Sequence, residues 1–190
     1  MGRYEIRLSG AGGQGMILAG IILAEAGVMV DDLNVSQSQS YGPESRGGAS
    51  RAEIVFDEEQ IDFPKVIKPD LLVCLTQAAF EKYGTDLKCY GVIIADSRID
   101  EAKIKPEFKD NIYQLDILDL AAQKIGKEIS ANMIVLGIIA RIIQRKIPVE
   151  FIKKAIIEKV PPKTVDANME AFEVGFDLKL DKRSYAYGRI

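Results

Sequence analysis

Residues 8–20 read LSGAGGQGMILAG and decide the fold. Gly10, Gly12 and Gly15 stand at the G-x-G-x-x-G spacing, after an alternating stretch that predicts a strand and before an apolar stretch at 16–30 that predicts a helix. Glycine permits left-handed backbone angles, and a helix start offers free N–H groups to an anion. The stretch therefore predicts a strand–turn–helix unit that binds an anion, although a tight turn needs glycine even without a ligand.

The rest of the chain alternates between strands and helices. Apolar runs at 69–75 and 91–95 predict buried parallel strands, and apolar residues at helical spacing predict helices after them, including a very apolar one at 132–144. This alternation predicts the α/β class, with a doubly wound, mostly parallel Rossmann-like sheet and C-terminal helices. From the length we expect a single domain over residues 1–190.

A polar stretch at 36–51, SQSQSYGPESRGGASR, interrupts this pattern and contains no Ile, Leu, Val, Met or Phe. The strands predicted on either side of it, at 33–39 and 51–56, indicate a β-hairpin inserted in the sheet. The stretch is longer than an ordinary connection of about 4–6 residues, so it is either a hairpin tip or a binding loop. Arg46 carries a guanidinium fork that can hold a phosphate or a carboxylate. We expect this loop to leave its strand beside the glycine turn.

Composition excludes several classes of protein. The chain has no histidine, which removes His-based acid–base catalysis, a Ser-His-Asp triad and imidazole metal ligands. It has no C-x-x-C, and Cys74 and Cys89 lack partners at metal-ligand spacing, so we expect two core thiols and neither a metal nor an iron–sulfur cluster. A net charge of -3 argues against a nucleic-acid-binding protein. The longest apolar run is too short to span a membrane. With no signal peptide at the start, we expect a cytoplasmic protein.

A complete NAD or FAD site also needs an acidic residue at the carboxyl end of the second strand. Asp31 and Asp32 lie at a suitable distance, but they precede the strand predicted at 33–39 and would fit only if the strand were 28–30. A free-standing NAD or FAD oxidoreductase is therefore the second interpretation. A docking module with a purely structural glycine turn is the third.

Two motifs together resemble the gamma subunit of 2-oxoacid:ferredoxin oxidoreductases, most closely the 2-oxoglutarate type. They are G-x-G-G-Q-G near the start and S-Y-G-P-E-S-R-G-G after it. A third motif, N-x-x-x-L-G at residues 132–137, adds to the resemblance. The resemblance covers essentially the whole chain. The candidate cofactor-binding residues that match the motifs are Gly10, Gly12, Gly13, Gln14, Gly15, Ser40, Tyr41, Gly42, Glu44, Arg46 and Gly47.

The resemblance implies a multisubunit enzyme that decarboxylates a 2-oxoacid, forms an acyl-CoA and reduces ferredoxin. It implies alpha, beta and ferredoxin-like partner subunits that hold thiamine diphosphate, Mg²⁺ and the iron–sulfur clusters. This chain agrees, because it has neither a G-D-G…N-N thiamine diphosphate motif nor cluster cysteines. We expect it to carry no catalytic residue, to be inactive alone, to assemble the complex and to help bind coenzyme A at its two loops. The sequence does not specify which 2-oxoacid is the substrate. It also does not specify whether the isolated chain forms a homodimer.

Overall fold

The computed structural model describes residues 2–40, 49–84, 86–100, 102, 106–124 and 131–180. Within these residues, one six-stranded sheet has the strand order β2–β3–β1–β4–β5–β6. The strands are β1 (Tyr4–Ala11), β2 (Asn34–Ser40), β3 (Ala49–Asp57), β4 (Leu71–Cys74), β5 (Val92–Asp96) and β6 (Ile112–Leu115). The helices are α1 (Met16–Val28), α2 (Gln77–Tyr83), α3 (Ile117–Lys124), α4 (Ala131–Ile143), α5 (Val149–Lys159) and α6 (Val165–Asp177), with short 3₁₀ helices η2 (Pro106–Asn111) and η4 (Pro162–Thr164).

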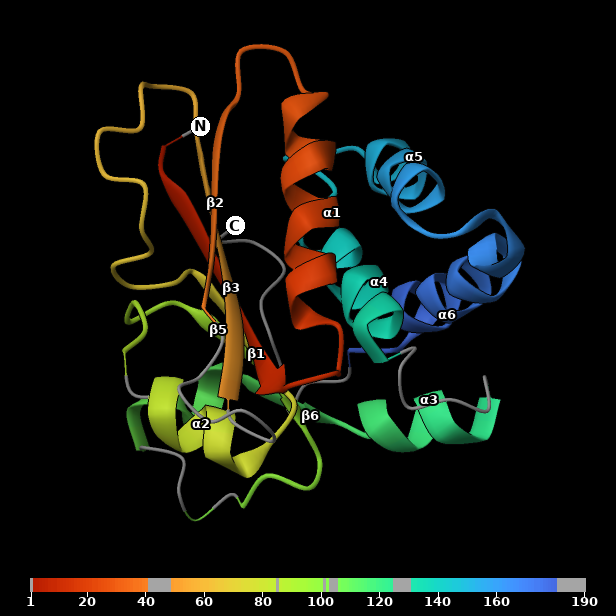
Figure 1. Cartoon of the computed structure of the whole chain (residues 1–190). Helices are drawn as coiled ribbons and strands as arrows, with labels where there is room; N and C mark the ends of the chain where they lie inside the picture. Colours follow the sequence, from red (N-terminus) through yellow and green to blue (C-terminus); the bar gives the residue numbers. More distant parts are fainter. Residues whose placement is uncertain are drawn as a thin grey trace.

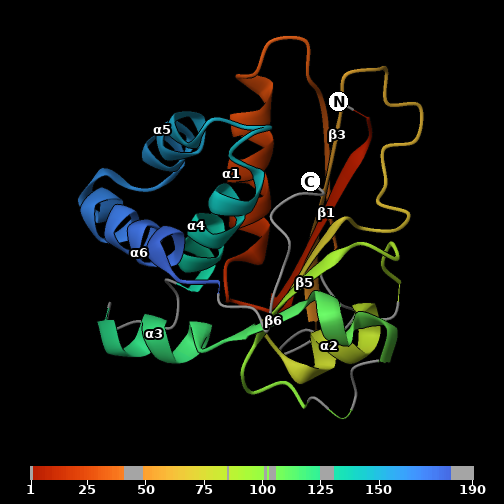
Figure 2. The same ribbon diagram turned by 180° about the vertical axis from the view of Figure 1, so that it is seen from behind.

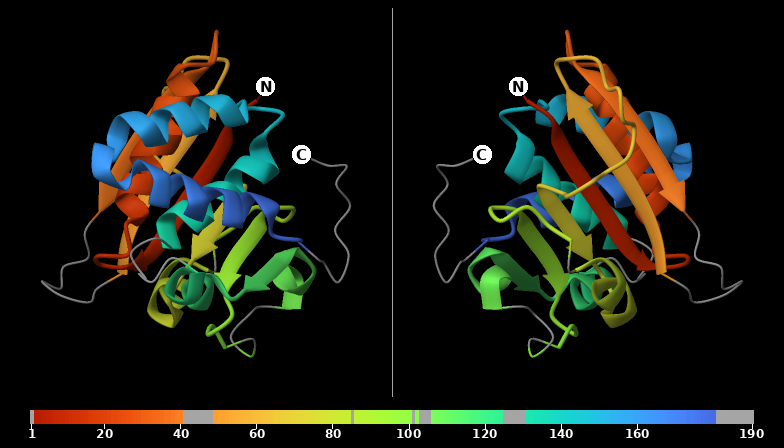
Figure 3. Two further views of the ribbon diagram at one scale, coloured as in Figure 1. Left: turned by 90° about the vertical axis from the view of Figure 1, so that its right-hand side faces the viewer. Right: turned by 90° about the vertical axis from the view of Figure 1, so that its left-hand side faces the viewer.

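The strand directions confirm a mostly parallel Rossmann-like sheet with a hairpin insertion. β1, β4, β5 and β6 run parallel to one another, whereas β3 runs antiparallel to both β1 and β2. The hairpin strands β2 and β3 occupy the side of β1 away from β4, so β2 is the edge strand (Figure 3). In a sheet of βαβ units alone, the second strand would instead pair in parallel with the first.

Helices cover both faces of the sheet, which confirms the doubly wound arrangement. α1, α4, α5 and α6 lie on one face, and α2 lies on the other (Figures 1 and 2). Each face has its own buried apolar cluster: a large one beneath the four helices, and a smaller one that includes Leu72, Phe80 and Ile93 beside α2. The three C-terminal helices therefore thicken one side of the molecule only.

α4 and α6 cross with their backbones in contact. A Cβ atom on Gly137 of α4 would overlap the carbonyl oxygen of Phe172, and one on Gly175 of α6 would overlap the carbonyl oxygen of Ile134. Neither position has room for a methyl group, because the atoms it would strike belong to the backbone of the facing helix. The glycine of N-x-x-x-L-G is therefore a packing residue that brings α6 onto α4.

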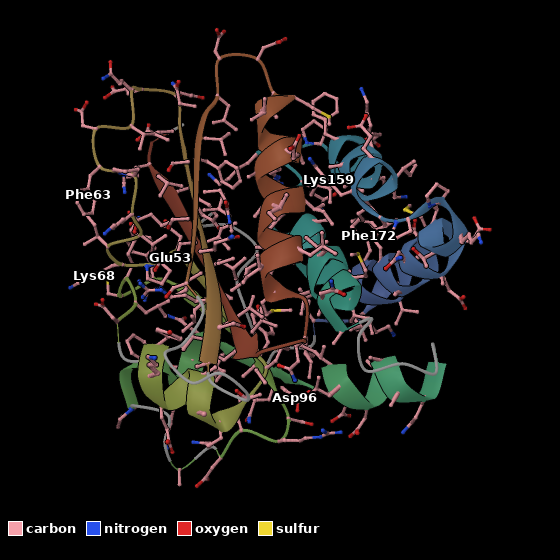
Figure 4. The ribbon with its side chains drawn as sticks, in the orientation of Figure 1. Glu53, Phe63, Lys68, Asp96, Lys159 and Phe172 are labelled. Atoms are coloured by element: carbon pink, nitrogen blue, oxygen red, sulfur yellow. The ribbon has the colours of Figure 1, made fainter. Side chains whose placement is uncertain are left out.

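The face of β1 and β3 away from α1 carries buried charges beside apolar side chains such as Val55. Arg7 Nε donates to Glu53 Oε1 at 2.8 Å, and both side chains are almost fully buried. Glu5 Oε2 accepts from the backbone N–H groups of Ile67 and Lys68, at 3.0 and 2.9 Å. Figure 4 shows Glu53, Phe63 and Lys68 on this side of the sheet. These polar contacts hold the segment 58–70 against the strands.

We expect Glu5→Ala to lower the free energy of unfolding by about 3 kcal/mol, because it leaves two backbone N–H groups and Arg3 Nε, 2.6 Å from Glu5 Oε1, without their acceptor. Chemical denaturation measures this loss. The matched control is Glu25→Ala, which removes an ion pair of the same length, 2.6 Å to Lys159, at the surface. Glu25→Ala should lower the free energy of unfolding by less than about 1 kcal/mol. Equal losses for the two variants would contradict the role of Glu5 as a buried acceptor that stabilises the fold.

Candidate functional site

The glycine turn connects the carboxyl end of β1 to the first residue of α1. Gln14 closes the turn from within: its backbone N–H donates to Ala11 O at 3.2 Å, and its Oε1 accepts from Ala11 N at 2.8 Å. A Cβ atom on Gly10 would lie only 2.6 Å from that Oε1. Of the predicted ligand-contacting residues, Gly10 and Gln14 thus have a visible role in shaping the turn.

Two glycines of the turn adopt backbone angles that other residues avoid. Gly13 has φ +92° and Gly15 has φ +74°. Gly15 is the N-cap of α1, where no side chain accepts a hydrogen bond from the first helical turn. Cβ atoms on Gly12 and Gly13 would meet nothing within 4 Å among the described atoms. The start of α1 therefore presents N–H groups and the positive end of the helix dipole to an open side of the turn, as an anion site requires.

Asn132, in the first turn of α4, lies directly on Gly15. Its Nδ2 donates to Gly15 O at 3.4 Å, and its Cγ lies 2.8 Å from where a Cβ on Gly15 would stand. The side chain is buried, and its Oδ1 has no hydrogen-bond partner within the part of the chain that the structure describes. Sequence reasoning named Asn132 as the first residue of the N-x-x-x-L-G motif at 132–137 but did not include it among the site residues. The available signal was that motif, with one amide at the start of a mostly apolar helix.

The second predicted loop begins and ends beside the turn. Ser40, the last residue of β2, pairs with Arg51 of β3, which in turn pairs with Ser9 of β1. Ser50 Oγ reaches the carbonyl oxygens of Gly10 and Ala11 at 3.3 and 3.4 Å. The register therefore brings both ends of the loop to the same edge of the sheet as the glycine turn. The other candidates, Tyr41, Gly42, Glu44, Arg46 and Gly47, lie outside the described residues.

Among the described residues, no acidic side chain takes the place of the ribose-binding acid of a dinucleotide site. Asp31 and Asp32 precede β2 and lie at the opposite end of the sheet from the turn, as expected. The parallel neighbour of β1 is β4, and it is followed by Thr76, whose Oγ1 caps α2 by accepting from Ala79 N. Asp96 ends β5 but already accepts hydrogen bonds from the N–H groups of Arg98 and Leu118. Figure 4 labels Asp96 at this end of the sheet.

The two cysteines differ from each other, which corrects one prediction. Cys74 is fully buried in β4, and burial raises the pKa of its thiol to about 12, so it stays protonated. Cys89 was predicted to be a core thiol as well, but it is exposed, because the chain turns at the surface before β5 begins. Within the described residues, His, Cys, Asp and Glu side chains form no group of three that could hold a metal ion.

Fold and turn together define a Rossmann-like α/β protein with a glycine turn at the start of its first helix and, in the described part of the chain, no ribose acid. The sequence profile of the pyruvate ferredoxin/flavodoxin oxidoreductase family matches residues 5–178, so the chain belongs to that family. The 2-oxoglutarate synthase subunit KorC of Methanocaldococcus jannaschii is 45% identical over 93% of this chain and 94% of its own length. These findings confirm the resemblance drawn from the two motifs.

Solved structures agree. The gamma subunit of a keto/oxoacid ferredoxin oxidoreductase from Geobacter sulfurreducens is 41% identical, with a TM-score of 0.78 over 93% of this chain and 96% of that one. A 2-oxoglutarate:ferredoxin oxidoreductase from Magnetococcus marinus, solved with 2-oxoglutarate, coenzyme A and succinyl-CoA bound, shares the fold over 92% of this chain and 30% of its own, with a TM-score of 0.74 and 22% identity. The helices of the described residues are all too short or too polar to cross a bilayer.

We expect Gly15→Ala to lower the free energy of unfolding by about 3 kcal/mol, because an L-residue resists the left-handed angle and the new methyl group would strike the Asn132 amide. Urea denaturation of both variants measures the effect. In the control, Gly12→Ala, the methyl group enters open space and should cost less than about 0.5 kcal/mol. A loss at Gly12 as large as that at Gly15 would show that the strain is not specific to the N-cap.

Proposed function

We propose that this chain is the gamma subunit of a 2-oxoglutarate:ferredoxin oxidoreductase. Such an enzyme decarboxylates 2-oxoglutarate oxidatively, forms an acyl-CoA and passes the electrons to ferredoxin. The observation that carries the proposal is 45% identity to a 2-oxoglutarate synthase subunit over nearly the full length of both chains. The glycine turn and the conserved shape of the gamma subunit fold support it.

The redox cofactors belong to partner subunits in this proposal. Iron–sulfur clusters require several cysteine thiolates, and this chain has two cysteines, of which Cys74 is a buried, protonated thiol. Its residues therefore do not fit a cluster, and the sequence has no thiamine diphosphate motif. We assign thiamine diphosphate, Mg²⁺ and the clusters to the alpha, beta and ferredoxin-like subunits. The chain then acts in the cytoplasm, as one domain over residues 1–190, by assembly and by ligand binding.

Coenzyme A is the ligand that the glycine turn fits best within this proposal. Its phosphates are anions, and the open N–H groups at the start of α1 offer donors and a positive dipole end. Ser40 and Ser50 show that the second loop starts and ends beside that turn. In the sequence, Arg46 of that loop supplies a permanent positive charge with a fork of donors. Turn and loop together would form one wall of a coenzyme A path.

Co-expression with the products of neighbouring reading frames tests the assignment. We expect this chain to co-purify with alpha, beta and ferredoxin-like chains, and the complex to reduce ferredoxin with 2-oxoglutarate and coenzyme A. Pyruvate should be used with kcat/KM lower by about tenfold or more, which corresponds to about 1.4 kcal/mol of transition-state binding. The chain alone should be inactive. Full activity of a complex that lacks this chain would refute the proposal.

In the assembled complex, we expect Arg46→Ala to raise the KM for coenzyme A by about tenfold or more, because one charge-assisted hydrogen bond to phosphate is lost. Arg46→Lys keeps the positive charge but not the fork of donors, so its KM for coenzyme A should lie between those of the unmodified complex and Arg46→Ala. Arg145, exposed after α4, provides the matched control, and Arg145→Ala should leave the KM unchanged. An unchanged KM in Arg46→Ala would remove this residue from the coenzyme A path.

A further inference from the structure

The segment 58–70 carries apolar, acidic and basic side chains at its surface. Phe63 is 51% exposed. Four charged side chains of the segment are also exposed and form no ion pair within the described residues: Glu59, Asp62, Lys65 and Lys68. Positions 59 and 68, and likewise 62 and 65, are centred between residues 63 and 64. The order of side chains is therefore acidic, apolar and basic in one direction, and the exact reverse in the other.

The two pairs of charges also lie apart in space. Asn34 of β2 donates from its Nδ2 to the carbonyl oxygen of Glu59 at 3.1 Å, so the acidic end of the segment lies at the edge strand. The backbone N–H of Lys68 donates to Glu5 of β1 at 2.9 Å, so the basic end lies at β1. Because β3 stands between β2 and β1, the two ends are separated by roughly 10 Å across the strands. Figure 4 labels Phe63 and Lys68 on the outer side of the molecule, away from α1.

Contacts with the sheet fix the backbone between these two ends. Ser36 Oγ donates to Pro64 O at 3.1 Å, and the Arg3 guanidinium donates to Lys65 O at 2.7 Å. Burial of the Glu5 carboxylate beneath the segment costs desolvation free energy, which is offset only while its hydrogen-bond donors stay in place. The segment therefore presents its exposed side chains in one conformation, and this lowers the entropy cost of association.

Charge complementarity selects the partner for this surface. A surface that fits it must offer basic, apolar and acidic side chains in the reverse order, and the same segment of a second copy does so. In a two-fold contact, residue i of one copy meets residue j of the other, and j meets i. Asp62 then meets Lys65 of the second copy, and Glu59 meets Lys68. The two Phe63 side chains meet near the two-fold axis, so every charge of the pattern gains an opposite one.

We propose that the segment 58–70 is a self-association surface, on which a second copy of this chain docks by a two-fold contact. The contact needs no other subunit, so it stands apart from the proposed function. A single segment buries less than the roughly 800 Å² per partner of a standard interface. We therefore expect a reversible dimer with a Kd of about 10–100 µM.

Sedimentation equilibrium of the full-length chain tests this, with a reductant present to keep Cys89 from forming a disulfide. We expect the double variant Lys65→Glu/Lys68→Glu to raise the Kd of the dimer by about tenfold or more, because each attraction becomes a repulsion. Glu59→Lys/Asp62→Lys should have the same effect. An equimolar mixture of the two variants should form a dimer again, with a Kd within about threefold of that of the unmodified chain, because the facing charges are opposite once more.

The matched control is Lys154→Glu/Lys163→Glu. Both lysines are exposed, on α5 and η4, across the sheet from the segment 58–70, so this double variant should leave the Kd unchanged within about twofold. The melting temperature should stay the same in all three double variants, because none of the replaced side chains has an ion pair in the described part of the chain.

Three results would overturn the inference: an unmodified chain that stays monomeric up to about 1 mM, a dimer that tolerates both charge reversals, or a mixture of the two variants that stays monomeric. A monomeric chain whose charge-reversed variants no longer join the alpha and beta chains would place a partner subunit on this surface, and would also overturn it. The proposed function is tested separately, by the activity of the assembled complex, and stands or falls without the dimer.

Discussion

The position of α4 is the constraint on which the rest of the structure depends. Its middle lies backbone to backbone against α6 at Gly137 and Gly175, and its first turn lies on the N-cap of α1 through Asn132. Neither contact tolerates a larger side chain at the glycine. α4 thus couples the C-terminal helices to the glycine turn, although the two are far apart in the sequence. The turn keeps its shape because a buried helix, and not only its own glycines, fixes Gly15.

Much of the fold was predictable, because local rules and tertiary packing agree there. The alternation at the start of the chain predicted β1, and the apolar runs predicted β4 and β5 as buried parallel strands. The hairpin was predictable as well, since a polar stretch lies between two strand patterns. The exposure of Cys89 was not predicted, because spacing along the chain says nothing about where a turn meets the surface.

Long-range polar pairing escaped prediction for a related reason. Alternating charges in β1 indicate a solvated face, yet Glu5 and Arg7 are buried beneath the segment 58–70. Only the fold brings Glu53 to Arg7 and the N–H group of Lys68 to Glu5, each from more than forty positions away. The same holds for the candidate site: the glycine spacing revealed the turn, but nothing near it in the sequence pointed to Asn132, which comes 117 positions after Gly15.

The exposed Cys89 affects how the self-association of the isolated chain can be studied. It lies in the turn before β5, at the amino end of that parallel strand, and so at the end of the sheet away from the glycine turn. Because Cys74 is buried, Cys89 is the thiol that air oxidation reaches first. Two copies joined through it would run as a covalent dimer. Sizing the chain with and without a reductant separates such an oxidation product from a genuine two-fold assembly.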